Sequence, residues 1–188
     1  MATVSYTRMA DMTAEDFRLM EADAERDEAQ LPGRLMDAVA QLDQFQGSAK
    51  VTRLEHSLQS ATRAHRAGKD KEYVAAALLH DIGDALAPVS HGEMVGAVLR
   101  PFVSERVCWM IQKHALFQAY YYAHLMGADR NARDKYLDHP FYDDCVEFCE
   151  HFDQNCFDPE YDSLPLEHFR PVIEAVFGRP PQAGPTAG

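Results

Sequence analysis

The segment LLHDIGD, Leu78 to Asp84, closes an apolar helical run and places His80 directly before Asp81. A neutral imidazole and an adjacent carboxylate can bind one metal ion together, and the carboxylate can also bridge two ions. An isolated His-Asp pair also occurs in proteins without any metal. The remaining ligands therefore decide between a metal centre and an ordinary buried pair.

The rest of the chain is predicted to form a series of helices. Its 188 residues and 46% hydrophobic content are typical of one globular domain. Apolar spacing and capping signals predict helices over 13–30, 35–45, 54–67, 70–80, 91–101, 104–114, 131–137, 141–152 and 166–177. Pro32 and Gly33 are expected to break the first helix, and the aromatic stretch 117–125 is expected to continue in helical form. The sequence thus predicts an all-α, compact helical bundle over 1–177 and a disordered tail over 178–188.

Charge and hydropathy exclude two classes of partner. The formal net charge is −12 without a balancing basic stripe, which argues against binding to a nucleic-acid backbone. No apolar run is long enough to span a membrane, and the N-terminus lacks a basic-then-apolar signal pattern. We therefore expect a cytoplasmic protein with a small-molecule substrate and an undetermined oligomeric state. The four cysteines are then reduced thiols rather than zinc ligands: Cys108, Cys145, Cys149 and Cys156.

Further ligands are available at His56, His91 and His114, each on a predicted helix of its own. A short connection makes consecutive helices antiparallel neighbours, which can bring His56 and His80 to one point in the core. Taken singly, each histidine is explained equally well as a core or helix-end residue. A late carboxylate could complete the set, but spacing does not choose among Asp143, Asp144, Asp153, Asp158 and Asp162.

The order His, His-Asp, His, His, Asp resembles the HD-domain superfamily in its six-ligand form. The chain is similar over roughly 35–177 to the mixed-valent diiron oxygenases of that superfamily, which include inositol oxygenase and the oxygenases of 1-hydroxyphosphonates. The segments that carry the similarity are LEHSLQ (54–59), LLHDIGD (78–84), HGEMVGAVLRPF (91–102) and KHALFQAYYYAH (113–124). The resemblance implies one iron bound by His56, His80, Asp81 and Asp153, and a second bound by His91 and His114, with Asp81 bridging the two.

The resemblance also implies a reaction. A mixed-valent Fe(II)/Fe(III) pair would use O2 as co-substrate to cleave the C–P bond of a 1-hydroxyphosphonate. The implied substrate is 1-hydroxy-2-(trimethylamino)ethylphosphonate, and the products are glycine betaine and phosphate. Two other functions remain open: a dinuclear HD phosphohydrolase acting on a nucleotide or phosphodiester, in which a metal-bound water attacks phosphorus, and a catalytically silent binding module.

Departures from the family pattern bear on substrate binding. A related enzyme for the primary-amine substrate has His where this chain has Asp84, Lys where it has Gln118, and a gating Tyr and Glu near Phe45 and Ser48. An added carboxylate and a lost lysine favour a cationic group, and aromatic rings attract quaternary ammonium. The predicted substrate-binding residues are Asp84, Gln118, Tyr120, Tyr121 and Tyr122, with Lys113, Arg130 and Arg133 for the phosphonate; Phe45, Phe117 and Arg53 are further candidates.

Overall fold

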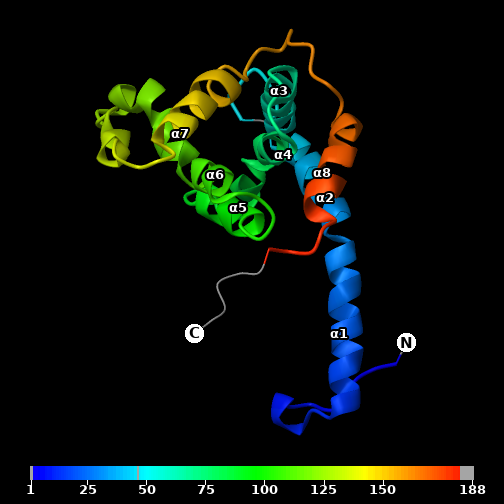
Figure 1. Ribbon diagram of the computed structural model, residues 1–188. Helices are drawn as coiled ribbons and strands as arrows, with labels where there is room; N and C mark the ends of the chain where they lie inside the picture. The colour runs from blue at the N-terminus through cyan, green and yellow to red at the C-terminus, as the bar shows by residue number, and fades with distance from the viewer. Residues whose placement is uncertain (1, 46, 183–188) are drawn as a thin grey trace.

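The computed structural model describes residues 2–45 and 47–182, and this part of the chain is helical without any strand (Figure 1). The all-α prediction is therefore confirmed. The α-helices are α1 (Ala14–Ala29), α2 (Leu31–Gln41), α3 (Arg53–Arg66), α4 (Lys71–Leu79), α5 (His91–Leu99), α6 (Glu105–Gln118), α7 (Tyr142–Phe148) and α8 (Arg170–Phe177). A π-helical turn, η7 (Cys149–Asp153), continues α7.

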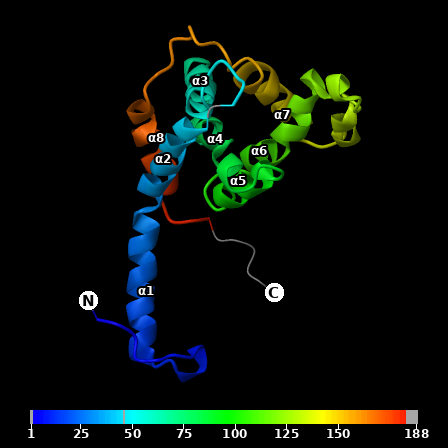
Figure 2. The same cartoon turned by 180° about the vertical axis from the view of Figure 1, so that it is seen from behind.

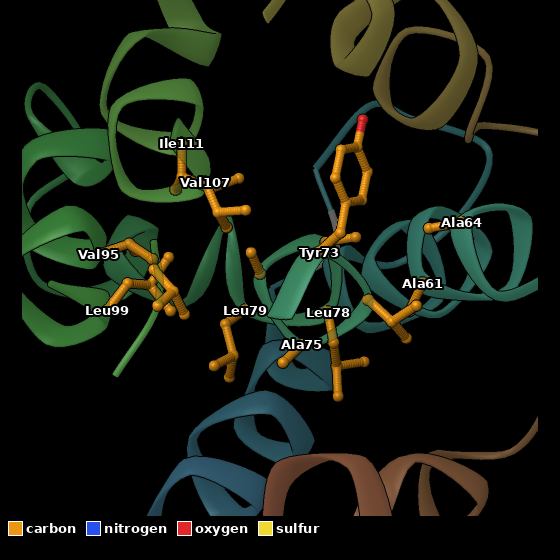
Figure 3. Packing of buried hydrophobic residues seen from close by; sticks show 14 of the residues in the cluster. Ala61, Ala64, Tyr73, Ala75, Leu78, Leu79, Val95, Leu99, Val107 and Ile111 are labelled. Atoms are coloured by element: carbon orange, nitrogen blue, oxygen red, sulfur yellow. The ribbon is translucent and has the colours of Figure 1, made fainter. Parts of the chain in front are cut away.

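The centre of the bundle is α4, which packs against α2, α3, α6 and α8. Its residues from Tyr73 to Leu79 are all buried, so the helix is apolar on every face, as a helix with no solvent side should be. Figure 3 shows Leu79 beside Val95 and Leu99 of α5, while the ring of Tyr73 points away from them. Full burial of each leucine contributes about 1.5–3 kcal/mol, so the run before the His-Asp pair is anchored from several sides.

Helix ends follow the capping signals. Asp70 accepts a hydrogen bond from the backbone N–H of Tyr73 at 2.9 Å and thereby caps α4, as predicted. Gly68 ends the preceding turn at a φ of +74°, a conformation that favours glycine. The first helix ends at Ala29, as the predicted break before Pro32 requires. The next helix begins earlier than Leu35, because Pro32 lies in the first turn of α2, where its missing N–H leaves no hydrogen bond unmade.

The aromatic stretch after α6 does not continue as one helix. It divides into two 3-10 segments, η4 (Ala119–Tyr121) and η5 (Ala123–Met126), which end at Gly127 with a φ of +71°. The expected helix over 131–137 is likewise a 3-10 segment, η6 (Ala132–Tyr136). These turns direct the tyrosines after Gln118 along a different path from the one that a continued α6 would give.

The two ends of the chain differ in how they meet the bundle. Figures 1 and 2 show α1 extending away from an otherwise compact body, nearly in line with α2. At the other end, Arg179 donates a hydrogen bond to Glu72 Oε1 at 2.7 Å, and the Gln182 amide donates to the Pro101 carbonyl at 2.7 Å. Residues 183–188 of the predicted disordered tail lie outside the described residues. Of the helices described, none combines the length and the apolar character needed to cross a bilayer.

Candidate metal centre

Six side chains from five separate segments meet at one point in the bundle. They are His56 on α3, His80 and Asp81 at the end of α4, His91 at the start of α5, His114 on α6 and Asp153 at the end of the π-helical turn. His56, His80, His114 and Asp153 are buried. The structure thus brings together all six residues that the family resemblance implies as metal ligands.

The first group of ligands surrounds His56. Its Nε2 lies 3.0 Å from Nε2 of His80, 3.5 Å from Asp81 Oδ2 and 3.3 Å from Asp153 Oδ1. His80 Nε2 is 3.4 Å from the same Asp81 oxygen. Four potential ligand atoms therefore face one another across a space suited to one ion.

The second group lies on the other side of Asp81. Nε2 of His91 and Nε2 of His114 are 3.1 Å apart, and they lie 3.7 Å and 3.5 Å from Asp81 Oδ1. Asp81 thus turns Oδ2 toward one group and Oδ1 toward the other. This is the arrangement that a carboxylate bridging two cations requires.

Backbone carbonyls fix the orientation of three of the imidazoles. Each of these rings directs Nδ1 to a carbonyl oxygen and so presents the lone pair of Nε2 to the centre. The acceptors are Cys156 O for His56 (3.0 Å), Ala77 O for His80 (2.8 Å) and Ile111 O for His114 (2.6 Å). His91 differs, because its Nδ1 lies 3.0 Å from Asp84 Oδ1 but makes no hydrogen bond with the described residues. The other oxygen of Asp84 pairs with Arg53.

The ligand atoms of the centre are placed as they would be around a bound cation, whereas without one they repel each other or lack a partner. When both rings of the His56–His80 pair carry their proton on Nδ1, two lone pairs face each other at 3.0 Å, which is repulsive without an electrophile between them. Two nitrogens each about 2.1 Å from a shared cation have about this separation. Asp153 Oδ2 is buried with no hydrogen-bond partner among the described residues, which is costly unless a ligand satisfies it.

The electrostatics of the centre point the same way. Burial raises the pKa of Asp81, but the imidazoles of His80, His114 and His56 outweigh it and hold that pKa well below its usual value. Burial lowers the pKa of His80. For His56, burial also lowers the pKa, but the carboxylates of Asp153 and Asp81 reverse the balance and raise it. The centre therefore attracts positive charge, and a divalent cation supplies it without protonating a buried ring.

The ligand chemistry limits the choice of metal. The set consists of four imidazoles and two carboxylates, a mixed N/O environment that suits iron and related transition metals. The buried thiols do not join it: the Sγ atoms of Cys149 and Cys156 donate to the backbone carbonyls of His114 and Phe152. A thiolate zinc site of the structural type is therefore not formed by these two cysteines.

A cavity of about 340 Å³ opens onto the centre. His56, Asp81 and His91 form its floor, and Gln118 reaches it from the end of α6 and donates a hydrogen bond from Nε2 to Asp153 Oδ1 at 2.6 Å. The remaining wall comes from the loop before α3, from the start of α3, from the 3-10 segment η3 (Ile82–Ala85) and from the segment after the π-helical turn: Phe45, Gly47, Ser48, Ala49, Val51, Thr52, Arg53, Asp84 and Phe157. The volume suits a small molecule rather than a polymer.

The predicted substrate-binding residues divide into two sets. Asp84 and Gln118 line the cavity, whereas the residues that line it do not include Tyr120, Tyr121, Tyr122, Lys113, Arg130 or Arg133, in the part of the chain that the structure describes. The guanidinium groups of Arg130 and Arg133 lie over the Tyr120 ring at 4.1 Å and 3.9 Å, and Lys113 pairs with Glu93 at 2.6 Å. Contact of this second set with substrate stays a prediction.

Sequence reasoning missed Phe157. Its ring lies 4.6 Å from the His56 ring and forms part of the cavity wall. No periodicity marks it, because it follows Cys156 in an irregular segment. The one structural signal is its neighbour, since the Cys156 carbonyl orients His56.

Comparison with known proteins agrees with this site. Residues 53–139 match the family model described as HD domain, and this range contains His56, His80, Asp81, His91 and His114. The matched range is similar to that family, and the all-α fold and a His-Asp cluster able to bind metal agree with the similarity. No curated protein matches the chain.

Proposed function

We propose that this protein is an oxygenase of the HD-domain superfamily that holds two iron ions and cleaves the C–P bond of a small 1-hydroxyphosphonate. The observation that carries the proposal is the division of six N/O ligands into two groups that share Asp81, one oxygen each, under a small cavity. A mononuclear site would not require His91 and His114 to face the second oxygen of that carboxylate.

The residues of each group have defined tasks. His56, His80 and Asp153 would hold one iron with Asp81, and His91 and His114 would hold the other with Asp81. When bound, a mixed-valent pair supplies one-electron chemistry with O2, which no amino-acid side chain here provides. The second group contributes three side chains against four in the first, and so leaves more room for oxygen atoms of a substrate.

The cavity wall supports a substrate with charges of both signs. Arg53 is the cation on the wall and is available to an anionic phosphonate from its exposed side. Phe45 and Phe157 are each partly exposed and present aromatic rings, which attract quaternary ammonium groups. We therefore assign the trimethylammonium contact to these two rings. Asp84 is already engaged by Arg53 and His91, so its task is to orient His91 rather than to bind the substrate cation.

The balanced reaction is the conversion of 1-hydroxy-2-(trimethylamino)ethylphosphonate and O2 to glycine betaine and phosphate. The C–P bond breaks, and the carbon that carried phosphorus is oxidised to the carboxylate while O2 is reduced. The cavity favours this substrate over a nucleoside polyphosphate, because Arg53 is the one arginine or lysine among its described lining residues and can offset the charge of one phosphonate but not that of several phosphates.

The test is anaerobic reconstitution with Fe(II), limited oxidation, and electron paramagnetic resonance. We expect a signal from a spin-coupled Fe(II)/Fe(III) pair, and one O2 consumed for each phosphate released from the hydroxyphosphonate. The same phosphonate without its hydroxyl group is the matched control and should not react. Phosphate release that is independent of O2, or hydrolysis of phosphodiesters with Mn²⁺ or Mg²⁺ alone, would replace the oxygenase by the hydrolase.

A further inference from the structure

One face of α3 directs polar side chains into the protein. His56, Gln59 and Arg63 follow one another at spacings of three and four, so they lie on the same side of the helix. Gln59 is completely buried, and His56 is 4% exposed. Burying a side-chain amide costs free energy unless its polar groups are hydrogen-bonded, so the contacts of Gln59 must account for its position.

These three side chains contact the same piece of chain. Residues 154–165 join the π-helical turn to the C-terminal helical segments; they are irregular and are hereafter called the strap. Figures 1 and 2 show the strap, in orange, running from the end of α7 past α3 to α8. Arg63 donates a hydrogen bond to the Asn155 carbonyl at 3.1 Å, and His56 Nδ1 lies 3.0 Å from the Cys156 carbonyl. The strap therefore follows the polar face of α3.

Gln59 binds the strap through both groups of its side-chain amide. Nε2 donates to the Asp158 carbonyl at 2.7 Å, and the Asp158 amide donates to Oε1 at 3.3 Å. The two hydrogen bonds fix the donor and the acceptor of one backbone residue, as a paired strand in a sheet would. The side chain of Asp158 takes no part in them, so the contact depends on Gln59 and on the path of the backbone.

The stretch that Gln59 holds begins at a metal ligand. Asp153 lies in the centre, and residues 154–157 connect it to Asp158. At the Asp153 end, the Cys156 amide donates to the Asp153 carbonyl at 3.0 Å. At the other end, Gln59 holds the backbone of Asp158. The carbonyl of Cys156 and the ring of Phe157 lie between these two fixed points.

Two parts of the site depend on this stretch. The Cys156 carbonyl is the partner of His56 Nδ1 and so directs Nε2 of that ring to the first group of ligands. The ring of Phe157 lines the cavity at 4.6 Å from the His56 ring. Because Phe157 is 43% exposed, packing alone does not hold its ring in place. Its position depends on the backbone of the residue that follows it.

We propose that Gln59 is a positioning residue that acts through the backbone of Asp158. It holds the Cys156 carbonyl against His56 and the Phe157 ring at the cavity. The described residues that line the cavity do not include Gln59, so its effect reaches the site through the strap and not through contact with a substrate. The inference rests on the metal centre of the proposed function, but neither on the identity of the metal nor on the reaction with O2.

The test is Gln59→Met, which keeps the length of the side chain and removes both hydrogen bonds. Their net contributions predict that the strap opens roughly 5–150-fold more often. Amide hydrogen exchange of residues 154–161 in the metal-free protein, followed by mass spectrometry, measures this opening. Titration of the same protein with Co²⁺, followed by visible absorption, measures the metal sites. We expect two ions per parent chain, and an affinity for one of them that is about 10–100-fold lower in Gln59→Met.

Thr62→Val is the matched control. Thr62 is also completely buried on α3, and its Oγ1 accepts a hydrogen bond from the Leu164 amide at 3.0 Å, near the far end of the strap. Valine should loosen the strap near Leu164 and leave both Co²⁺ affinities at the values of the parent chain. Gln59→Asn is a second variant for the case in which methionine disturbs folding. It keeps the amide but is one methylene too short for either hydrogen bond, so it should lower the Co²⁺ affinity in the same way.

The outcomes separate this proposal from the proposed reaction. Unchanged binding of both Co²⁺ ions by Gln59→Met or Gln59→Asn, or an equal loss of affinity in Thr62→Val, would overturn the role of Gln59. A parent chain that binds no Co²⁺ would overturn the metal centre together with it. Phosphate release without O2 would refute the oxygenase alone, because Co²⁺ binding is measured in the absence of substrate.

Discussion

The substitution Gly92→Ala should separate the two helices that carry the second group of ligands. Gly92 follows His91 on α5 and faces the backbone of α6, where a Cβ would lie 2.9 Å from Ile111 O and 3.1 Å from Gln112 O. Ordinary contact begins at 3.4 Å, so α5 must retreat by about 0.5 Å, because a backbone carbonyl cannot turn aside as a side-chain end can. Overpacking of this kind costs about 1–3 kcal/mol.

The displacement acts directly on the metal centre. His91 Nε2 lies 3.1 Å from His114 Nε2, and metal ligands tolerate errors of only about 0.2 Å in their distances. We therefore expect the reconstituted Gly92→Ala protein to lose one of two metal ions and to unfold roughly 3–10 °C lower than the parent chain. Metal analysis of the desalted protein and a thermal scan of its metal-free form measure the two effects separately.

Gly33→Ala is the matched control. Gly33 lies on the exposed side of α2, and a Cβ there would meet nothing within 4 Å. Alanine should stabilise the helix at this position by about 0.5–1 kcal/mol and leave both metal ions in place. Two ions and an unchanged unfolding temperature in Gly92→Ala would refute the argument that the close α5–α6 crossing positions His91.

Three further results are expected. Asp84→Asn should lower the metal affinity of the second site about 10–100-fold, because it removes the carboxylate beside His91 Nδ1. Asp37→Asn, at an exposed position, should leave that affinity unchanged. Equal metal affinities of the two variants in isothermal titration calorimetry would contradict this. Burial raises the pKa of the Cys156 thiol to about 12, with Asp153 adding to it, so a colorimetric thiol reagent at pH 8 should react only after unfolding. Hydrogen bonds from Thr13 and Ser5 lower the pKa of Asp16 from 3.8 to about 2. The stability that the ionised Asp16 gives to α1 is therefore fully present above pH 3.8 and is lost as the pH falls through about 2. An Asp16 pKa of 3.8 or higher in a nuclear magnetic resonance titration would exclude the capping box.

Local sequence patterns were sufficient to predict most of the helices and the His80-Asp81 pair at the centre of the site. The apolar run that ends at His80 and Asp81 is buried on every side, and the Asp70 cap lies where its spacing predicted it. Such features depend on hydrogen bonds and burial within a few residues, which a sequence displays directly. The resemblance to a six-ligand family added His56, His91, His114 and Asp153.

The position of Asp153 and the contacts of Asp84 depend on the tertiary structure. Asp153 reaches the centre because a π-helical turn, closed by a hydrogen bond of 3.0 Å from the Gln154 amide to the Cys149 carbonyl, ends the helix at the right rotation. No spacing rule separates it from the other late carboxylates. Contact of Asp84 with a substrate cation stays a prediction, but its ion pairs with Arg53 and His91, which lie on other helices, were not predicted from the sequence. Contacts between residues far apart in the chain depend on how the helices cross, and the local pattern of a sequence does not contain that information.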